Sequence, residues 1–154
     1  MLDDTDKEIL KLLLEDSSAS SRFIAEKLNK SPTTILNRLK KLKETYIQHE
    51  GILLSSEALG FEWTVITEVL VSKGKLDETE EKIAKIPNTI AVYDVTGQTD
   101  IIVISKFRTR DAISKFTKQL LAMEYVERTI SHIVLNTVKE DFAFKDQLRL
   151  LDEN

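Results

Sequence analysis

The stretch from Ser31 to Glu44 reads S-P-T-T-I-L-N-R-L-K-K-L-K-E and decides the fold, because it combines a helix start with two opposite faces. Ser31 can cap the free amide groups of the first turn, and Pro32 suits the first helical position. At helical spacing one face is apolar and carries Ile35, Leu36, Leu39 and Leu42. The other face carries hydroxyl, amide and cationic groups, from Thr33, Thr34, Asn37, Arg38 and Lys41. This pattern predicts a recognition helix that packs on a core and lies in a groove of duplex DNA.

The composition narrows the class of protein. The 154 residues suffice for one domain of ordinary size or two small ones, and 42% hydrophobic with 31% charged residues predicts a folded, soluble chain. No run approaches the roughly 18 apolar residues of a membrane span, and the start M-L-D-D is acidic, unlike a secretory signal. We therefore expect a cytoplasmic protein without a membrane partner. With no cysteine and two histidines, no metal site and no cofactor is predicted.

The charge is unevenly distributed. The formal net charge is −4, yet the segment from Ser17 to Lys43 holds seven basic residues and one acidic residue, which is +6, leaving −10 elsewhere. An acidic protein with one basic segment can still bind DNA, because attraction to the DNA depends on the local electrostatic field within about 10 Å and not on the total charge. The alternative is that the lysines only solvate a surface helix.

Two further helices are predicted before this segment. The first runs to about Glu15 and starts either at Asp3 or at a capping box formed by Thr5 and Glu8, and the sequence leaves both starts open. The second begins near Ser20. The three helices predict a winged-helix-like helix-turn-helix domain over residues 1–45.

The rest of the chain predicts a sheet domain. A connector over residues 46–61 contains an extended segment at 47–54 and a turn that ends at Gly60. Strands are expected at 64–72, 90–96, 101–107 and 127–138, and helices at 77–86 and 109–123. We expect the second helix to bury Ile113, Phe116, Leu120 and Leu121. The order βαββαβ predicts a ferredoxin-like four-stranded antiparallel sheet over residues 62–140, hence an α+β protein with a tail at 141–154.

The predicted strands are apolar on both faces. Ile101–Ile104 has no polar position, and Ile66 and Leu70 alternate with valines. Because both helices would cover one face, the other needs a second subunit. This predicts a homodimer that pairs two recognition helices.

The order of parts resembles the Lrp/AsnC family of prokaryotic transcription regulators, also called feast/famine regulators. The resemblance is carried by four motifs: L-D-D-T-D-K-E-I-L from Leu2, I-A-E-K-L-N-K-S-P-T-T-I-L-N-R-L-K-K-L from Ile24, A-L-G at 58–60 and G-Q-T-D-I-I-V from Gly97. It implies a dimer that binds amino acids or related molecules at subunit interfaces. Members of the family often assemble further, and for this chain the sequence leaves a tetramer or an octamer open. The sequence departs from the family with Ser17-Ser18, Thr45 and Thr99, where Gly-Arg, glycine and an aromatic residue are usual.

Two sets of site residues follow. For DNA we predict Thr33, Thr34, Asn37, Arg38 and Lys41. Arg38 would bind guanine and Asn37 adenine, while the alternative for Arg38 is a salt bridge within its own domain. For a small molecule, the resemblance implies Gly97, Thr99, Asp100 and, more weakly, Ser131. The alternative is that Gly97 and Asp100 are ordinary hairpin residues.

The function predicted is sequence-specific DNA binding and transcription regulation, modulated by an amino acid or a related small molecule. The alternative is a sensing interaction module whose helical domain docks on protein rather than DNA. An enzyme is not expected, because the sheet half offers no nucleophile or base beside a cationic site and no glycine-rich phosphate loop.

Overall fold

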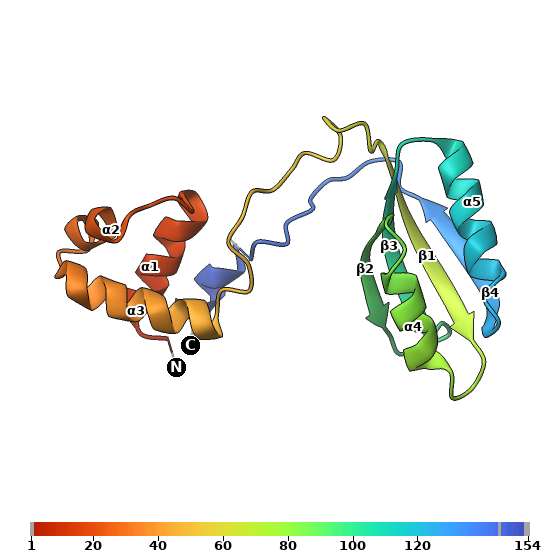
Figure 1. Cartoon of the computed structure of the whole chain (residues 1–154), viewed down its shortest axis with the longest axis horizontal. Coiled ribbons are helices and arrows are strands. Elements are labelled where there is room, and N and C mark those ends of the chain that lie inside the picture. Colours follow the sequence, from red (N-terminus) through yellow and green to blue (C-terminus); the bar gives the residue numbers. More distant parts are fainter. Residues whose placement is uncertain (1, 145, 153–154) are drawn as a thin grey trace. The chain divides into compact units, whose positions relative to one another are not determined.

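The computed structural model describes residues 2–144 and 146–152, and they fall into two compact units (Figure 1). One unit holds residues 2–53 together with the described residues after 138, and the other holds residues 54–138. We call them the helical unit and the sheet unit. None of the described helices is long and apolar enough to cross a membrane.

Three helices form the helical unit: α1 (Asp4–Glu15), α2 (Ser21–Lys27) and α3 (Pro32–Thr45). Each begins after a residue whose side chain caps it, namely Asp3, Ser20 and Ser31. Of the two starts left open for the first helix the structure has Asp3, in a capping box with Asp6. Asn29 takes the left-handed conformation, with φ at 51°, in the turn that leads to α3.

The core of the helical unit is a single apolar cluster. Its buried members come from all three helices and are Ile9, Ile24, Ala25, Ile35, Leu39 and Leu42. The prediction that Leu36 belongs to this face is wrong, because its side chain is 54% exposed. Leu36 is one position from Ile35 and three from Leu39, which places it at the edge of the apolar stripe of α3. The part of α3 that packs on the core is narrower than this stripe and does not include Leu36.

The sheet unit has the predicted ferredoxin-like order. Its elements are β1 (Trp63–Val71), α4 (Leu76–Ala84), β2 (Thr89–Asp94), β3 (Ile101–Phe107), α5 (Arg110–Leu121) and β4 (Val126–Ile133). The strands lie in the order β2-β3-β1-β4 and every pair is antiparallel. This confirms the four-stranded sheet that the alternation of elements predicted.

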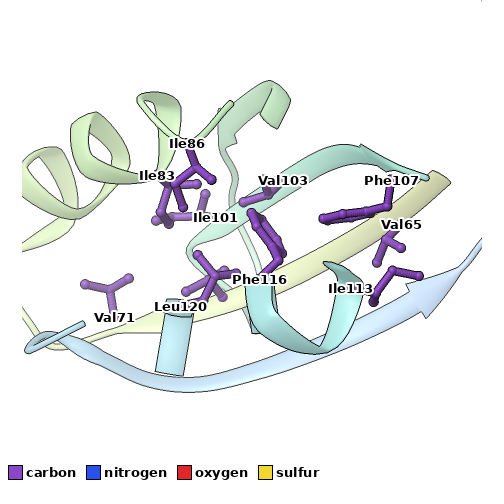
Figure 2. Close-up of a cluster of buried hydrophobic side chains, with 11 residues drawn as sticks. Val65, Val71, Ile83, Ile86, Ile101, Val103, Phe107, Ile113, Phe116 and Leu120 are labelled. Atoms are coloured by element: carbon purple, nitrogen blue, oxygen red, sulfur yellow. The ribbon is translucent and has the colours of Figure 1, made fainter. Parts of the chain in front are cut away.

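One face of the sheet carries the core (Figure 2). Val65 and Val69 of β1 and Val103 of β3 are fully buried, and Ile83 of α4 and Leu120 of α5 pack in the same cluster. The rings of Phe107 and Phe116 meet edge to face with centroids 5.2 Å apart. Both helices therefore cover the same face, as predicted.

Three local predictions differ from the structure. The last strand ends at Ile133, which pairs with Val65, rather than at 138, and one further hydrogen bond joins the amide of Val134 to the carbonyl oxygen of Thr64. Because β1 begins at Trp63, two residues before Val65, it offers no partner for residues 136–138. Leu121 is 51% exposed instead of buried, since α5 turns that position away from the sheet. The segment 47–54 forms no strand, and its apolar side chains Ile52 and Leu53 are exposed.

The end of the chain belongs to the helical unit. A 3-10 helix, η1 (Gln147–Asp152), follows the return from the sheet unit. The ammonium group of Lys7 on α1 donates a hydrogen bond of 2.8 Å to the carbonyl oxygen of Leu151. The tail thus contacts the chain's own first helix through this hydrogen bond.

Candidate functional site

The outer surface of α3 presents polar groups to solvent. Thr33, Thr34, Asn37 and Lys41 all have exposed side chains. Thr34 shares a hydrogen bond of 2.8 Å with the capping hydroxyl of Ser31, and its amide donates to the same oxygen at 3.1 Å. The start of the helix is therefore held rigidly, while Asn37 and Lys41 are presented one and two turns further on.

Arg38 lies between this surface and α1. Its Nη1 group donates hydrogen bonds to Oδ2 of Asp3 at 2.6 Å and to Oδ1 of Asp6 at 2.7 Å. The Arg38 side chain is 31% exposed and that of Asp6 only 17%. The alternative of an ion pair within its own domain thus describes this structure, and the guanine contact remains a prediction that would require these two bonds to open.

The contact shifts the pKa values of Asp3 and Arg38. The pKa of Asp3 lies below its ordinary value, first because the backbone amide of Asp6 donates to its carboxylate, and second because Arg38 does so. The same two carboxylates raise the pKa of Arg38, with Asp6 the larger cause. The contact therefore favours the charged forms of Asp3 and Arg38.

A shallow groove of about 710 Å³ runs along α3 beside this ion pair. Its walls come from the start of α1 and the length of α3, and include Asp3, Asp6, Thr34, Asn37, Arg38 and Lys41. The groove therefore gathers four of the five predicted DNA-binding residues. Thr33 lies outside it, exposed on the first turn of α3.

Two exposed apolar side chains lie on the helix-turn-helix itself. Leu36 of α3 is 54% exposed and Phe23 of α2 is 44% exposed, with the ammonium group of Lys27 5.6 Å from the Phe23 ring centroid. Apolar side chains on a recognition helix can contact the methyl group of thymine. Sequence reasoning missed Leu36 as a surface residue, because periodicity places it at the edge of the core stripe.

The predicted effector residues lie in the loop between β2 and β3. The hydroxyl of Thr99 donates to the carbonyl oxygen of Val69 at 2.9 Å, and Oδ2 of Asp100 accepts the amide hydrogen of Val71 at 2.8 Å. Both side chains thus pin the loop to the end of β1. Gly97 stands at the exposed loop tip with φ at 131°, a conformation that favours glycine.

Ser131 lies apart from this loop on β4. Its hydroxyl is 3.3 Å from the hydroxyl of the buried Thr67, on the side of the sheet that faces the helices. In the described chain, Ser131 does not join Gly97, Thr99 and Asp100 in one site. No group of acidic or histidine side chains in the described chain is placed to hold a metal ion.

The face of the sheet away from the helices is apolar at its centre. Cross-strand pairing places Ile66 beside Ile104 and His132, and Ile102 beside Tyr93 and Glu68. We call this surface the open face, and its apolar members are Ile66, Leu70, Tyr93, Ile102, Ile104 and Ile130. On this face Nε2 of His132 lies within hydrogen-bond distance, 2.8 Å, of Oε1 of Glu68.

Comparisons with known proteins match both units. Residues 2–43 match the model of the AsnC-type helix-turn-helix domain, and residues 64–144 match that of the Lrp/AsnC ligand binding domain. An uncharacterised HTH-type transcriptional regulator of Pyrococcus furiosus is 46% identical over 145 residues, covering 94% of this chain and 98% of that protein. The HTH-type transcriptional regulator FL11 of Pyrococcus horikoshii is 33% identical over 140 residues, covering 90% and 93%.

Solved structures give the same fold. A transcriptional regulator of Neisseria meningitidis in complex with L-Met has a TM-score of 0.84 at 27% identity, covering 93% of this chain and 96% of that one. Escherichia coli AsnC has a TM-score of 0.88 at 22% identity, covering 92% and 97%.

Proposed function

The chain belongs to the Lrp/AsnC family of transcriptional regulators, and from this premise we propose a sequence-specific DNA-binding regulator that acts as a dimer or higher oligomer and responds to an amino acid or related small molecule. The observation that carries the proposal is the outer surface of α3. It exposes hydroxyl, amide and cationic side chains within a segment of charge +6. No enzymatic step is part of this function.

We assign base recognition to Asn37 and phosphate contacts to Thr33, Thr34 and Lys41. An asparagine can bind the N6 and N7 edge of adenine in two places, which contributes roughly 1–3 kcal/mol of discrimination. Threonine hydroxyls and a lysine ammonium group suit phosphate oxygens, which fix the register of the protein on the duplex. Asn37 stands one turn after Thr33 and one turn before Lys41, so all three can face one groove.

The open face is proposed to be covered by a second copy. Ile66, Ile102 and Ile104 lie together at the centre of the sheet, and the two helices of the sheet unit already cover the opposite face. A two-fold dimer through this face buries the isoleucines and presents two α3 helices. Such a dimer binds a roughly palindromic site with half-sites about one helical turn apart. Association of dimers into a tetramer or octamer is compatible with this arrangement.

The effector is proposed to bind at the loop of Gly97, Thr99 and Asp100. The Oδ2 atom of Asp100 accepts from Val71, which leaves Oδ1 to receive an ammonium group. Nothing lies within 4 Å of the place where a side chain of Gly97 would begin, so a carboxylate has room to approach the backbone there. The L-Met bound by the N. meningitidis regulator supports an amino acid as the class of effector.

Selection of bound sequences from a random duplex pool, with and without a panel of amino acids, tests the proposal. We expect one enriched, roughly palindromic site whose enrichment changes with at least one amino acid. The Lys41→Ala variant should reduce the slope of log affinity against log salt by about one unit per half-site. Lys85→Ala, which removes an exposed lysine of the sheet unit, is the matched control. Absence of any enriched duplex would favour the protein-docking module instead.

A further inference from the structure

The contact between Arg38 and the start of α1 is built from groups that are already fixed. In the capping box, Oδ1 of Asp3 accepts the amide hydrogen of Asp6 at 2.9 Å, and Oδ2 of Asp6 accepts the amide hydrogen of Asp3 at 3.3 Å. The remaining oxygen of each carboxylate accepts from Nη1 of Arg38. All four carboxylate oxygens are therefore used, two for the helix cap and two for the guanidinium group.

We propose that Arg38 is a positioning residue, which with Asp3 and Asp6 forms a clasp that sets the orientation of α3 on α1 and so the register of Asn37 and Lys41 on DNA. This inference rests on the proposed function and deepens it. It replaces the guanine contact first predicted for Arg38.

The geometry favours a clasp over an incidental surface pair. The capping box already fixes both carboxylates, so bonding to Arg38 costs them little further side-chain entropy. The Arg38 and Asp6 side chains are largely covered, which reduces screening by solvent and salt. Bonds between ionised donors and acceptors are also shorter and stronger than neutral ones.

The clasp also removes an electrostatic conflict. Asp3 and Asp6 line the same groove as Thr34, Asn37 and Lys41, and two carboxylates there would repel a phosphate. The guanidinium group of Arg38 lies within hydrogen-bond distance of both and offsets part of that charge. Base recognition by Arg38 would pull it away and leave both acids facing the DNA backbone.

A double-mutant cycle on the full-length protein tests the clasp. Arg38→Met, Asp6→Asn and the double variant are compared for affinity to the selected duplex and to a set with single base-pair changes. We expect each single variant to weaken binding to every duplex by about tenfold without altering the order of preference, and the double variant to be no weaker than either. Asp4→Asn is the matched control, because Asp4 lies on the same first turn, is fully exposed, and has its carboxylate 4.0 Å from the ammonium group of Lys7 rather than bonded to Arg38.

The Asp6→Asn variant is the sharpest arm of the experiment. Removing a negative charge beside DNA should by itself tighten binding, whereas loss of the clasp weakens it. Asparagine can still accept the capping hydrogen bond, so the helix start is retained. Circular dichroism at the assay temperature confirms that all variants are folded, and Arg38→Lys should recover part of the affinity, because one ammonium group replaces part of the contact.

Two outcomes overturn the clasp. One is that Arg38→Met flattens the preference at a single base pair while Asp6→Asn binds equally or more tightly, which is the signature of a base contact. The other is strict additivity of the two substitutions. If the wild type selects no duplex, the proposed function fails independently of the clasp. The same double-mutant cycle is then measured by thermal unfolding, where coupling between Arg38 and Asp6 supports the clasp and additivity of the two substitutions overturns it.

Discussion

Replacing Ile104 by glutamate should dissociate the proposed dimer. Ile104 is on the central strand β3, where it pairs with Ile66 of β1 and with Ala91 of β2 on the open face. Its side chain is half-buried in the single chain, so association through this face would cover the remainder. A charge at this point would be enclosed by apolar side chains on both copies.

The magnitude follows from the area that association would remove from water. Full burial of an isoleucine side chain contributes about 1.5–3 kcal/mol, and because Ile104 is already mostly covered, no more than about a third of that remains to be gained in the dimer. A two-fold axis buries Ile104 of both copies, so the loss is about 1–2 kcal/mol, or roughly a 5- to 30-fold weaker dimer. Burying an unpaired carboxylate adds to this, so the dissociation constant should rise at least that far.

Sedimentation over a dilution series measures the effect. Leu121→Glu is the control, because Leu121 is 51% exposed on α5, which packs on the opposite face of the sheet. We expect Leu121→Glu to associate like the wild type and Ile104→Glu to be monomeric over most of the range. Equal association of Ile104→Glu and wild type, or a wild type that stays monomeric throughout, would refute the open face as the dimer interface.

Three further predictions concern single side chains. If Leu36 contacts a thymine methyl group, replacing that thymine by deoxyuridine in the selected site should weaken wild-type binding by about fourfold per contacted methyl. The affinity of Leu36→Ala should be the same for the thymine and deoxyuridine duplexes, and titration of each protein with both duplexes measures this. Asp100→Ala leaves the amide of Val71 without its acceptor and should lower the stability of the sheet unit by about 1–3 kcal/mol in urea unfolding. The lowered pKa of Asp3 means that its contribution to stability is present above the unfolded pKa, near 3.9, and is lost as pH falls through the folded value. Asp3→Asn should therefore flatten the acid branch of the stability profile below about pH 4, measured by thermal unfolding, and an unchanged profile would contradict this.

Local sequence signals predicted most of the helical unit correctly. Ser20 and Ser31 cap their helices as expected, because capping depends only on residues three or four positions apart. The pairing of Arg38 with Asp3 and Asp6 joins residues more than thirty positions apart, and no periodic pattern encodes it. Charge counts in a basic segment therefore predicted a DNA-binding surface without revealing that Arg38 is already engaged with Asp3 and Asp6.

In the sheet unit, too, patterns within one segment were predicted correctly and contacts between distant segments were not. The run Ile101–Ile104 predicted a strand apolar on both faces, and the structure has Ile101 and Val103 in the core with Ile102 and Ile104 on the open face. The end of β4 was missed because it depends on where pairing with β1 stops, at Val65 and Ile133, and not on the apolar residues of β4 itself. The roles of Thr99 and Asp100 in fixing the loop also depend on contacts with β1, about thirty residues away.

The connectivity of the chain bears on how an effector could influence DNA binding. The chain leaves the helical unit after residue 53 and returns to it after residue 138, so two segments rather than one join the units. The return is secured by the contact of Lys7 with Leu151, on the same helix α1 that carries Asp6. Two tethers restrict the orientations of a domain more than one does, because each closes a loop. If an effector binds at the Asp100 loop, as proposed, it binds beside the end of β1, and β1 and the neighbouring β4 are each joined to one of the two segments. We therefore expect a change in the sheet to reach the helical unit through these segments, and the proposed clasp would pass a shift of α1 on to α3.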